Sequence, residues 1–229
     1  MFNTENLNRQ IRMLWKDTID AGQWPSELQR VWPLQYAPIP TPSLLFVGLN
    51  PSYTLRDEAA RQERPIDERN TSVLMETNDV EALCEDNVVA ENPYFRPFEA
   101  FIKGTPVKHW AHVDIFAVRE TNQSVVETAL GLNGDWTDFA MKQWAVFMDL
   151  LEQLDPPAIV VPNAKASRIL KDVLKAGDMC EQSLCHFFRL NGRDVPIFFA
   201  GMLSGQHAMD VYSKARLEYV VRKKLCSMG

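Results

Sequence analysis

Apolar stretches alternate with polar, helix-like segments in the first third of the chain. Residues 4–21 carry apolar side chains at helical spacing and stop at Gly22, which predicts an amphipathic helix. A proline-rich, extended lead-in follows, and residues 44–47 (Leu-Leu-Phe-Val) predict a buried strand that ends at Gly48. Residues 56–70 alternate acids and bases, which is typical of a solvated helix or a long surface loop.

The middle of the chain continues this alternation. Strands are predicted over residues 110–118 and 158–161, because each is a short, largely apolar run. Helices are predicted over residues 135–154 and 164–176, and Gly177 is expected to cap the second of them.

A hairpin is predicted near the end of the sequence. The dipeptide Asn191-Gly192 favours a tight two-residue turn, so residues 185–190 are expected to form an antiparallel edge strand beside a last core strand at 196–200. A final helix is expected from about Ala208. The whole order predicts an α/β protein, a three-layer α/β/α sandwich with a mostly parallel central sheet.

Length and composition favour a single-domain protein without a membrane span. A chain of 229 residues, 46% hydrophobic, suits a single domain over residues 1–229, in which residues 1–42 form the N-terminal helix and lead-in. We expect neither a membrane span nor a signal peptide, because no apolar run is long enough and the N-terminus lacks a basic segment. The four cysteines are scattered and are interpreted as reduced thiols of a cytoplasmic protein.

The net charge of −6 argues against broad electrostatic binding of nucleic acid, which depends on lysine and arginine. Any contact with DNA is therefore expected to be local. No metal site is expected either: His109 and His112 lie an odd number of residues apart in a predicted strand, so their side chains point to opposite faces.

Three predicted strands end at residues with functional groups. The carboxyl ends of parallel strands meet at one edge of a sheet, where ligands bind in proteins of this class. The segments are Gly48-Leu49-Asn50-Pro51-Ser52-Tyr53, then Asp114, then Gly201-Met202-Leu203-Ser204-Gly205-Gln206-His207.

Each of these segments has a structural and a functional interpretation. Asn50 offers an amide to water or a ligand, or it belongs to an ordinary Asn-Pro turn. Ser204-Gly205, expected directly before a helix, offers a phosphate site at the positive end of the helix dipole, or an ordinary N-cap. Asp114 in an apolar strand is costly to bury, so it either lines a pocket or forms a buried pair with Arg119 or Lys108.

Together these segments resemble the uracil-DNA glycosylase superfamily, in order and spacing, from Ser43 to Asp210. That superfamily has an α/β/α fold, a first motif of the form G-x-N-P-x, and a final motif such as N-P-S-G. The matching stretches here are Gly48-Leu49-Asn50-Pro51-Ser52, Asn92-Pro93-Tyr94-Phe95-Arg96-Pro97-Phe98, Asp114 in place of a base-reading asparagine, residues 158–166, and Met202-Leu203-Ser204-Gly205.

The resemblance implies hydrolysis of the N-glycosidic bond of a flipped nucleotide in DNA, by a monomer that needs no cofactor. Asn50 is then expected to position the attacking water. The other implied roles are phosphate binding by Ser52, Ser204 and Gly205, with Lys165 or Arg119 nearby, and contact with the base by Asp114, Tyr53 or Tyr94.

The sequence departs from the family pattern at two places. No histidine begins the last motif, and Gln206 and His207 stand where a leucine wedge would follow. An ionised Asp114 can only accept hydrogen bonds, so poor uracil handling is expected near neutral pH unless burial keeps the carboxyl protonated.

Two other classes of function stay open. A non-catalytic binder of a nucleotide or nucleic acid on the same fold fits the acidic charge and the missing histidine. A serine hydrolase would use Ser204 with His207 and Asp210, although the spacing differs by one from the G-x-S-x-G nucleophile elbow.

Overall fold

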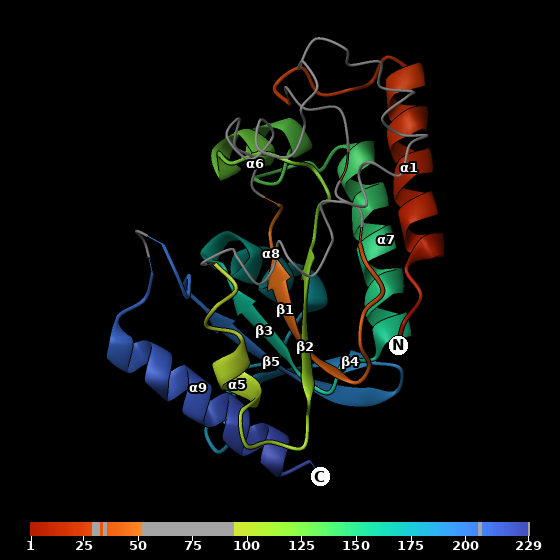
Figure 1. The fold of residues 1–229 in the computed structure, drawn as a ribbon. Coiled ribbons are helices and arrows are strands. Elements are labelled where there is room, and N and C mark those ends of the chain that lie inside the picture. Colours follow the sequence, from red (N-terminus) through yellow and green to blue (C-terminus); the bar gives the residue numbers. More distant parts are fainter. Residues whose placement is uncertain (29–32, 34–35, 52–93, 206–207, 229) are drawn as a thin grey trace.

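A mostly parallel sheet lies at the centre of the protein (Figure 1). The computed structural model describes residues 1–28, 33, 36–51, 94–205 and 208–228. Within these residues, five strands form one sheet in the order β2-β1-β3-β5-β4. Their bounds are β1 Ser43–Gly48, β2 His109–Asp114, β3 Ile159–Pro162, β4 His186–Leu190 and β5 Arg193–Ala200.

The predicted hairpin is confirmed. β4 pairs with β5 in the antiparallel sense and lies at the edge of the sheet, while the other neighbouring strands pair in parallel. Asn191 and Gly192 both have positive φ, at 48° and 76°, as a tight two-residue turn between twisted strands requires. The strands predicted at 44–47 and 158–161 are also present.

The second strand is shorter than predicted, because β2 ends at Asp114 and not at Val118. Residues 115–118 are nevertheless buried, which explains their apolar pattern. The Ile115 N–H donates to the Gly48 carbonyl and the Phe116 N–H to the Leu49 carbonyl, both at 3.0 Å. The loop after β2 is thus hydrogen-bonded along the loop after β1.

Helices connect and cover the strands. Their bounds are α1 Glu5–Asp20, α5 Glu99–Ile102, α6 Gln123–Leu130, α7 Asp138–Leu154, α8 Ala164–Leu174 and α9 Val211–Cys226. The helices expected at 4–21, 135–154 and 164–176 are therefore confirmed, with slightly different ends. The C-cap of α8 is Lys175, in the left-handed conformation with φ 47°, and not Gly177. The helix α6 was not predicted.

Residues of one strand pack alternately on the two faces of the sheet. Leu45 and Val47 belong to one buried hydrophobic cluster, which includes residues of α1, α6, α7 and α8. Leu44 and Phe46 belong to another, which includes residues of α5 and α9. Figure 1 shows α5 and α9 together, away from α1 and α7. Among the described residues, no helix is long and apolar enough to cross a membrane.

Candidate functional site

The strand order identifies one edge of the sheet as the candidate site. From β1 the chain passes to β2 on one side and later returns to β3 on the other, so the direction of winding changes beside β1. Ligands of open α/β sheets bind at such a switch point, beyond the carboxyl ends of the strands. Gly48, the last residue of β1, is in register with Asp114, the last residue of β2.

Asp114 and Gly48 are in close contact at this edge. A Cβ atom added to Gly48 would collide with Oδ1 of Asp114 and would lie 3.1 Å from Nε2 of His112. Gly48 is therefore required by the approach of a neighbouring side chain, and not only by the turn that follows the strand. The carboxyl group lies directly over the backbone at the end of β1.

Among the described residues, Asp114 has no basic partner within ion-pair distance other than His112. Its side chain is 4% exposed, and Nδ1 of His112 lies 3.9 Å from Oδ2. Burial raises the pKa of Asp114 to about 8 and lowers the pKa of His112 to about 3, because both charged forms lose their hydration. At pH 7 the carboxyl is therefore protonated and the imidazole is neutral.

The buried ion pairs suggested for Asp114 by the sequence are not present. Among the described residues, neither Arg119 nor Lys108 forms an ion pair with Asp114, and the ammonium of Lys108 donates instead to the Thr105 carbonyl at 3.0 Å. Arg119 is itself buried, with 8% of its surface exposed. Within the described part of the chain, the burial of Asp114 is therefore accommodated by protonation and not by a cation.

Aromatic rings surround His112. The rings of Tyr94, Phe95 and Phe98 have centroids 5.6, 5.2 and 5.9 Å from that of His112. The pKa of Tyr94 is raised, first by burial and then by the negative charge that Asp114 carries when ionised. The structure therefore places Tyr94 near Asp114, and the resemblance assigns both residues to contact with the base. His112 was missed, although residues two apart in a strand point to the same face.

Asn50 joins the loops that follow β1 and β2. Its Nδ2 donates to the carbonyls of Pro51, Val118 and Glu120, at 3.1, 3.3 and 2.6 Å. Its Oδ1 is buried and has no hydrogen-bond partner among the described residues. The three carbonyls fix the orientation of the amide, since a flipped amide would place Oδ1 against them. An unmet buried acceptor costs about 1–3 kcal/mol, which a water or ligand hydrogen would offset.

Ser204 and Gly205 do not lie at the start of a helix. α9 begins at Val211, and its N-cap is Asp210, whose carboxylate accepts from the N–H groups of Tyr212 and Ser213. The Ser204 hydroxyl donates to the backbone carbonyl of Tyr94 at 3.3 Å. The predicted phosphate site at a helix N-terminus is therefore wrong, and the strand-to-helix turn of a nucleophile elbow is also missing here.

Four of the predicted site residues lie outside the described residues, namely Ser52, Tyr53, Gln206 and His207.

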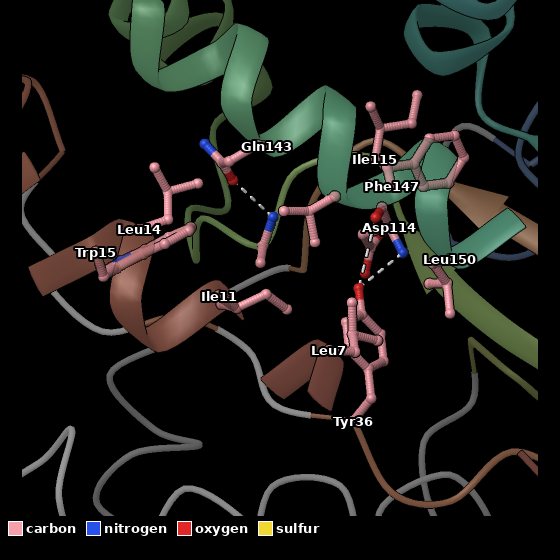
Figure 2. A pocket seen from close by; sticks show the side chains of 12 residues that line it. Leu7, Ile11, Leu14, Trp15, Tyr36, Asp114, Ile115, Gln143, Phe147 and Leu150 are labelled. Atoms are coloured by element: carbon pink, nitrogen blue, oxygen red, sulfur yellow. Dashed lines mark hydrogen bonds between the residues drawn. The ribbon is translucent and has the colours of Figure 1, made fainter. Parts of the chain in front are cut away.

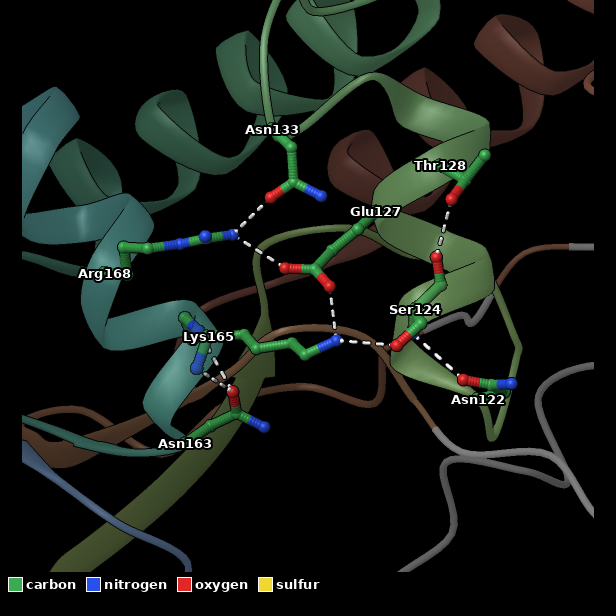
Figure 3. A network of polar contacts seen from close by, with 9 residues as sticks. Asn122, Ser124, Glu127, Thr128, Asn133, Asn163, Lys165 and Arg168 are labelled. Carbon is green, nitrogen blue, oxygen red and sulfur yellow. Dashed lines mark hydrogen bonds and ion pairs between the residues drawn. The ribbon is translucent and has the colours of Figure 1, made fainter.

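Lys165, expected near the phosphates, is part of an ion-pair network (Figure 3). The carboxylate of Glu127 in α6 accepts from the ammonium of Lys165 and, at 2.7 Å, from the guanidinium of Arg168, both in α8. Lys165 also donates to the Ser124 hydroxyl at 3.2 Å, and Arg168 to Oδ1 of Asn133 at 2.8 Å. The network connects the helices that follow β2 and β3. The sequence analysis missed it.

A small cavity lies on the opposite face of the sheet, between α1 and α7 (Figure 2). Its lining is mostly apolar, so it is a packing feature of the core. The hydroxyl of Tyr36 accepts from the Asp114 N–H at 3.1 Å and donates to the Asp114 carbonyl at 3.4 Å. Tyr36 thereby fixes the backbone of Asp114 from the face opposite to its carboxyl group.

Within the described part of the chain, no group of three or more His, Cys, Asp or Glu residues could hold a metal ion. No protein-family model and no curated protein matches this chain.

Proposed function

We propose that this protein is a DNA glycosylase-type hydrolase, with the three-layer α/β/α architecture of the uracil-DNA glycosylase superfamily. The observation that carries the proposal is the buried Oδ1 of Asn50, an acceptor held in a fixed orientation at the switch point of the sheet. Such an atom can accept a hydrogen of a water molecule and so orient the water's lone pair. In this reaction the water attacks C1′ of a flipped nucleotide, and the base leaves with the electrons of the N-glycosidic bond and takes up the proton that the water loses.

Asp114 suits the recognition of a base edge. A protonated carboxyl donates through its O–H and accepts through its other oxygen, as an asparagine amide does. It can therefore pair with the O4 and N3–H of uracil at neutral pH, and the raised pKa removes the reason for expecting poor uracil handling there. Tyr94 and Phe95 supply aromatic surface next to it. Because Asp114 is nearly covered, base recognition requires that its carboxyl be uncovered on binding.

The test measures base release from labelled oligonucleotides that carry uracil, hypoxanthine, xanthine or mismatched thymine, by alkaline cleavage at the abasic site. Asn50→Ala should lower the single-turnover rate by about 10²- to 10⁴-fold, because the positioning group is lost, while DNA affinity changes little.

The matched control is Asn163→Ala. Asn163 is another buried asparagine at the same sheet edge, and its Oδ1 caps α8 by accepting from the Lys165 and Ala166 N–H groups. Its replacement should cost about 1 kcal/mol of stability and leave the rate per folded molecule unchanged. Equal rate losses in the two variants would show that Asn50 acts only through the fold.

A second candidate is a nucleotide or nucleic-acid binder without catalysis. It is favoured by the near-complete burial of Asp114, which keeps the carboxyl proposed to recognise the base covered in this structure. Retention of the labelled oligonucleotide with no base released from any substrate would select this function. A serine hydrolase is disfavoured, because Ser204 donates to a backbone carbonyl and lies outside a strand-to-helix turn.

A further inference from the structure

Two cysteines face each other at the start of the edge strand β4, remote in sequence from Asn50 and Asp114. Cys180 and Cys185 form an isolated antiparallel bridge, with the Cys180 N–H donating to the Cys185 carbonyl at 2.8 Å. The Leu184 N–H donates back to the Cys180 carbonyl at 2.7 Å. Antiparallel partners have Cα atoms about 4.5–5.5 Å apart, within the range of about 4.4–6.8 Å that disulfides span.

Ser183 lies between the two cysteines in the sequence and interacts with both thiols. The thiol of Cys185 donates to the Ser183 hydroxyl at 3.2 Å, and Ser183 also lowers the pKa of the Cys180 thiol. Cys180, Cys185 and Cys226 are free thiols in the structure, so the pair is present in its reduced form.

The two sulfurs differ in reactivity. Cys180 is partly exposed, and its pKa is lowered by the side-chain and backbone hydrogen bonds of Ser183 and, further, by the charge of Lys224. Cys185 is buried, and burial raises its pKa. Lys224 projects from α9 with its ammonium 5.2 Å from the Phe187 ring centre, at the beginning of β4. A partly exposed thiol with a lowered pKa, next to a buried thiol, is the arrangement of an attacking and a resolving cysteine.

We propose that Cys180 and Cys185 are an oxidative modification site, which oxidants of the peroxide class close to an intramolecular disulfide. The Cys180 thiolate attacks one oxygen of the peroxide, the O–O bond breaks, and a sulfenic acid and hydroxide form. The Cys185 thiol then attacks the Cys180 sulfur, the S–O bond breaks and water leaves. Two thiols and one hydrogen peroxide thus give one disulfide and two waters, and an external thiol reverses the change.

The test treats the full chain with hydrogen peroxide and then alkylates the remaining thiols under denaturing conditions. Trypsin releases both cysteines in one peptide, residues 176–189. This peptide should carry two alkyl groups before oxidation, none afterwards with a loss of two hydrogens, and two again after dithiothreitol. Alkylation at both cysteines after peroxide, or a disulfide from either of them to Cys84, Cys226 or another molecule, would overturn the proposal.

Variants distinguish the attacking cysteine, Cys180, from the resolving cysteine, Cys185. Cys185→Ser should leave Cys180 as a sulfenic or more oxidised acid, whereas Cys180→Ser should protect Cys185 from peroxide. Because Cys180 is only partly buried, its serine variant should fold even if the Cys185 variant does not, and circular dichroism checks both.

Lys224→Gln should slow the oxidation of Cys180 by about twofold to tenfold, because it removes the neighbouring positive charge. The control Cys226→Ser should form the same disulfide at the unchanged rate, and oxidation of Cys185 in the Cys180 variant would contradict the assignment.

Discussion

Two carboxyl groups of this protein are buried, and the cost of burying their charge is avoided in different ways. Glu127, with 9% of its side chain exposed, is compensated by the cations of Lys165 and Arg168. Asp114, with 4% of its side chain exposed, has the neutral His112 as its ion-pair contact among the described residues, and burial favours its protonated form. The ion-paired carboxylate holds two helices together. The protonated carboxyl of Asp114 retains a hydrogen-bond donor and an acceptor. Asp114 is therefore a candidate for binding a ligand, whereas Glu127 has a structural role.

The largest effect on stability is expected at Glu127. Glu127→Ala should lower the free energy of unfolding by about 2–3 kcal/mol, because it leaves the cations of Lys165 and Arg168 without their anion and removes the connection between α6 and α8. This is below the cost of breaking a fully buried pair, since Lys165 and Arg168 are 31% and 51% exposed and can be solvated. Urea-induced unfolding measures this change in the free energy of unfolding. The control Asp20→Ala, which removes the exposed Lys16–Asp20 pair, should change stability by less than about 1 kcal/mol.

A smaller loss of stability is expected from Gly48→Ala. The added methyl group collides with the Asp114 carboxyl, so one of the two residues must shift, at a cost of about 1–2 kcal/mol. The double variant Gly48→Ala/Asp114→Ala should recover most of this loss, because the second change removes the colliding atoms. Strict additivity of the two single changes in urea unfolding would show that the contact is not what requires a glycine.

The smallest effect is the pH dependence of stability. Between pH 7 and 8 the folded Asp114 still holds a proton that the unfolded chain, with its pKa near 3.8, has lost. Stability should therefore fall by about 1 kcal/mol as the pH rises over this unit. His112 adds little in this window, since it is neutral in the folded state and largely neutral in the unfolded state. Asp114→Asn should remove this dependence. The same slope in wild type and variant would mean that Asp114 is already ionised.

Much of the fold follows from local patterns in the sequence. The strand at 44–47, the hairpin at Asn191-Gly192 and the longer helices were predicted, because each is determined by neighbouring residues. The short helix α6 was not, since eight residues give little periodic signal; the Asn122 N-cap and Gly131 in the left-handed conformation mark its ends. The start of α9 was placed too early because Asp210 is the residue that caps it.

The site was predicted only in part. The approach of Asp114 to the end of β1 follows from parallel strands ending together, and the structure also brings Tyr94 close to it. The protonation of Asp114 depends on burial among side chains distant in sequence, which no local pattern encodes. The same holds for Lys165, whose partner Glu127 precedes it by 38 residues.

The hydrogen bonds between the loops after β1 and β2 limit the changes in length that these two loops can accept. Backbone bonds join Ile115 to Gly48, Phe116 to Leu49 and Glu120 to Pro51, and Asn50 adds bonds from its side chain. An insertion or deletion in one of these segments would break the register unless the other changed with it. Length variation, and with it new specificity, is therefore expected to enter at other connections of the same sheet edge, such as those after β3 and β5.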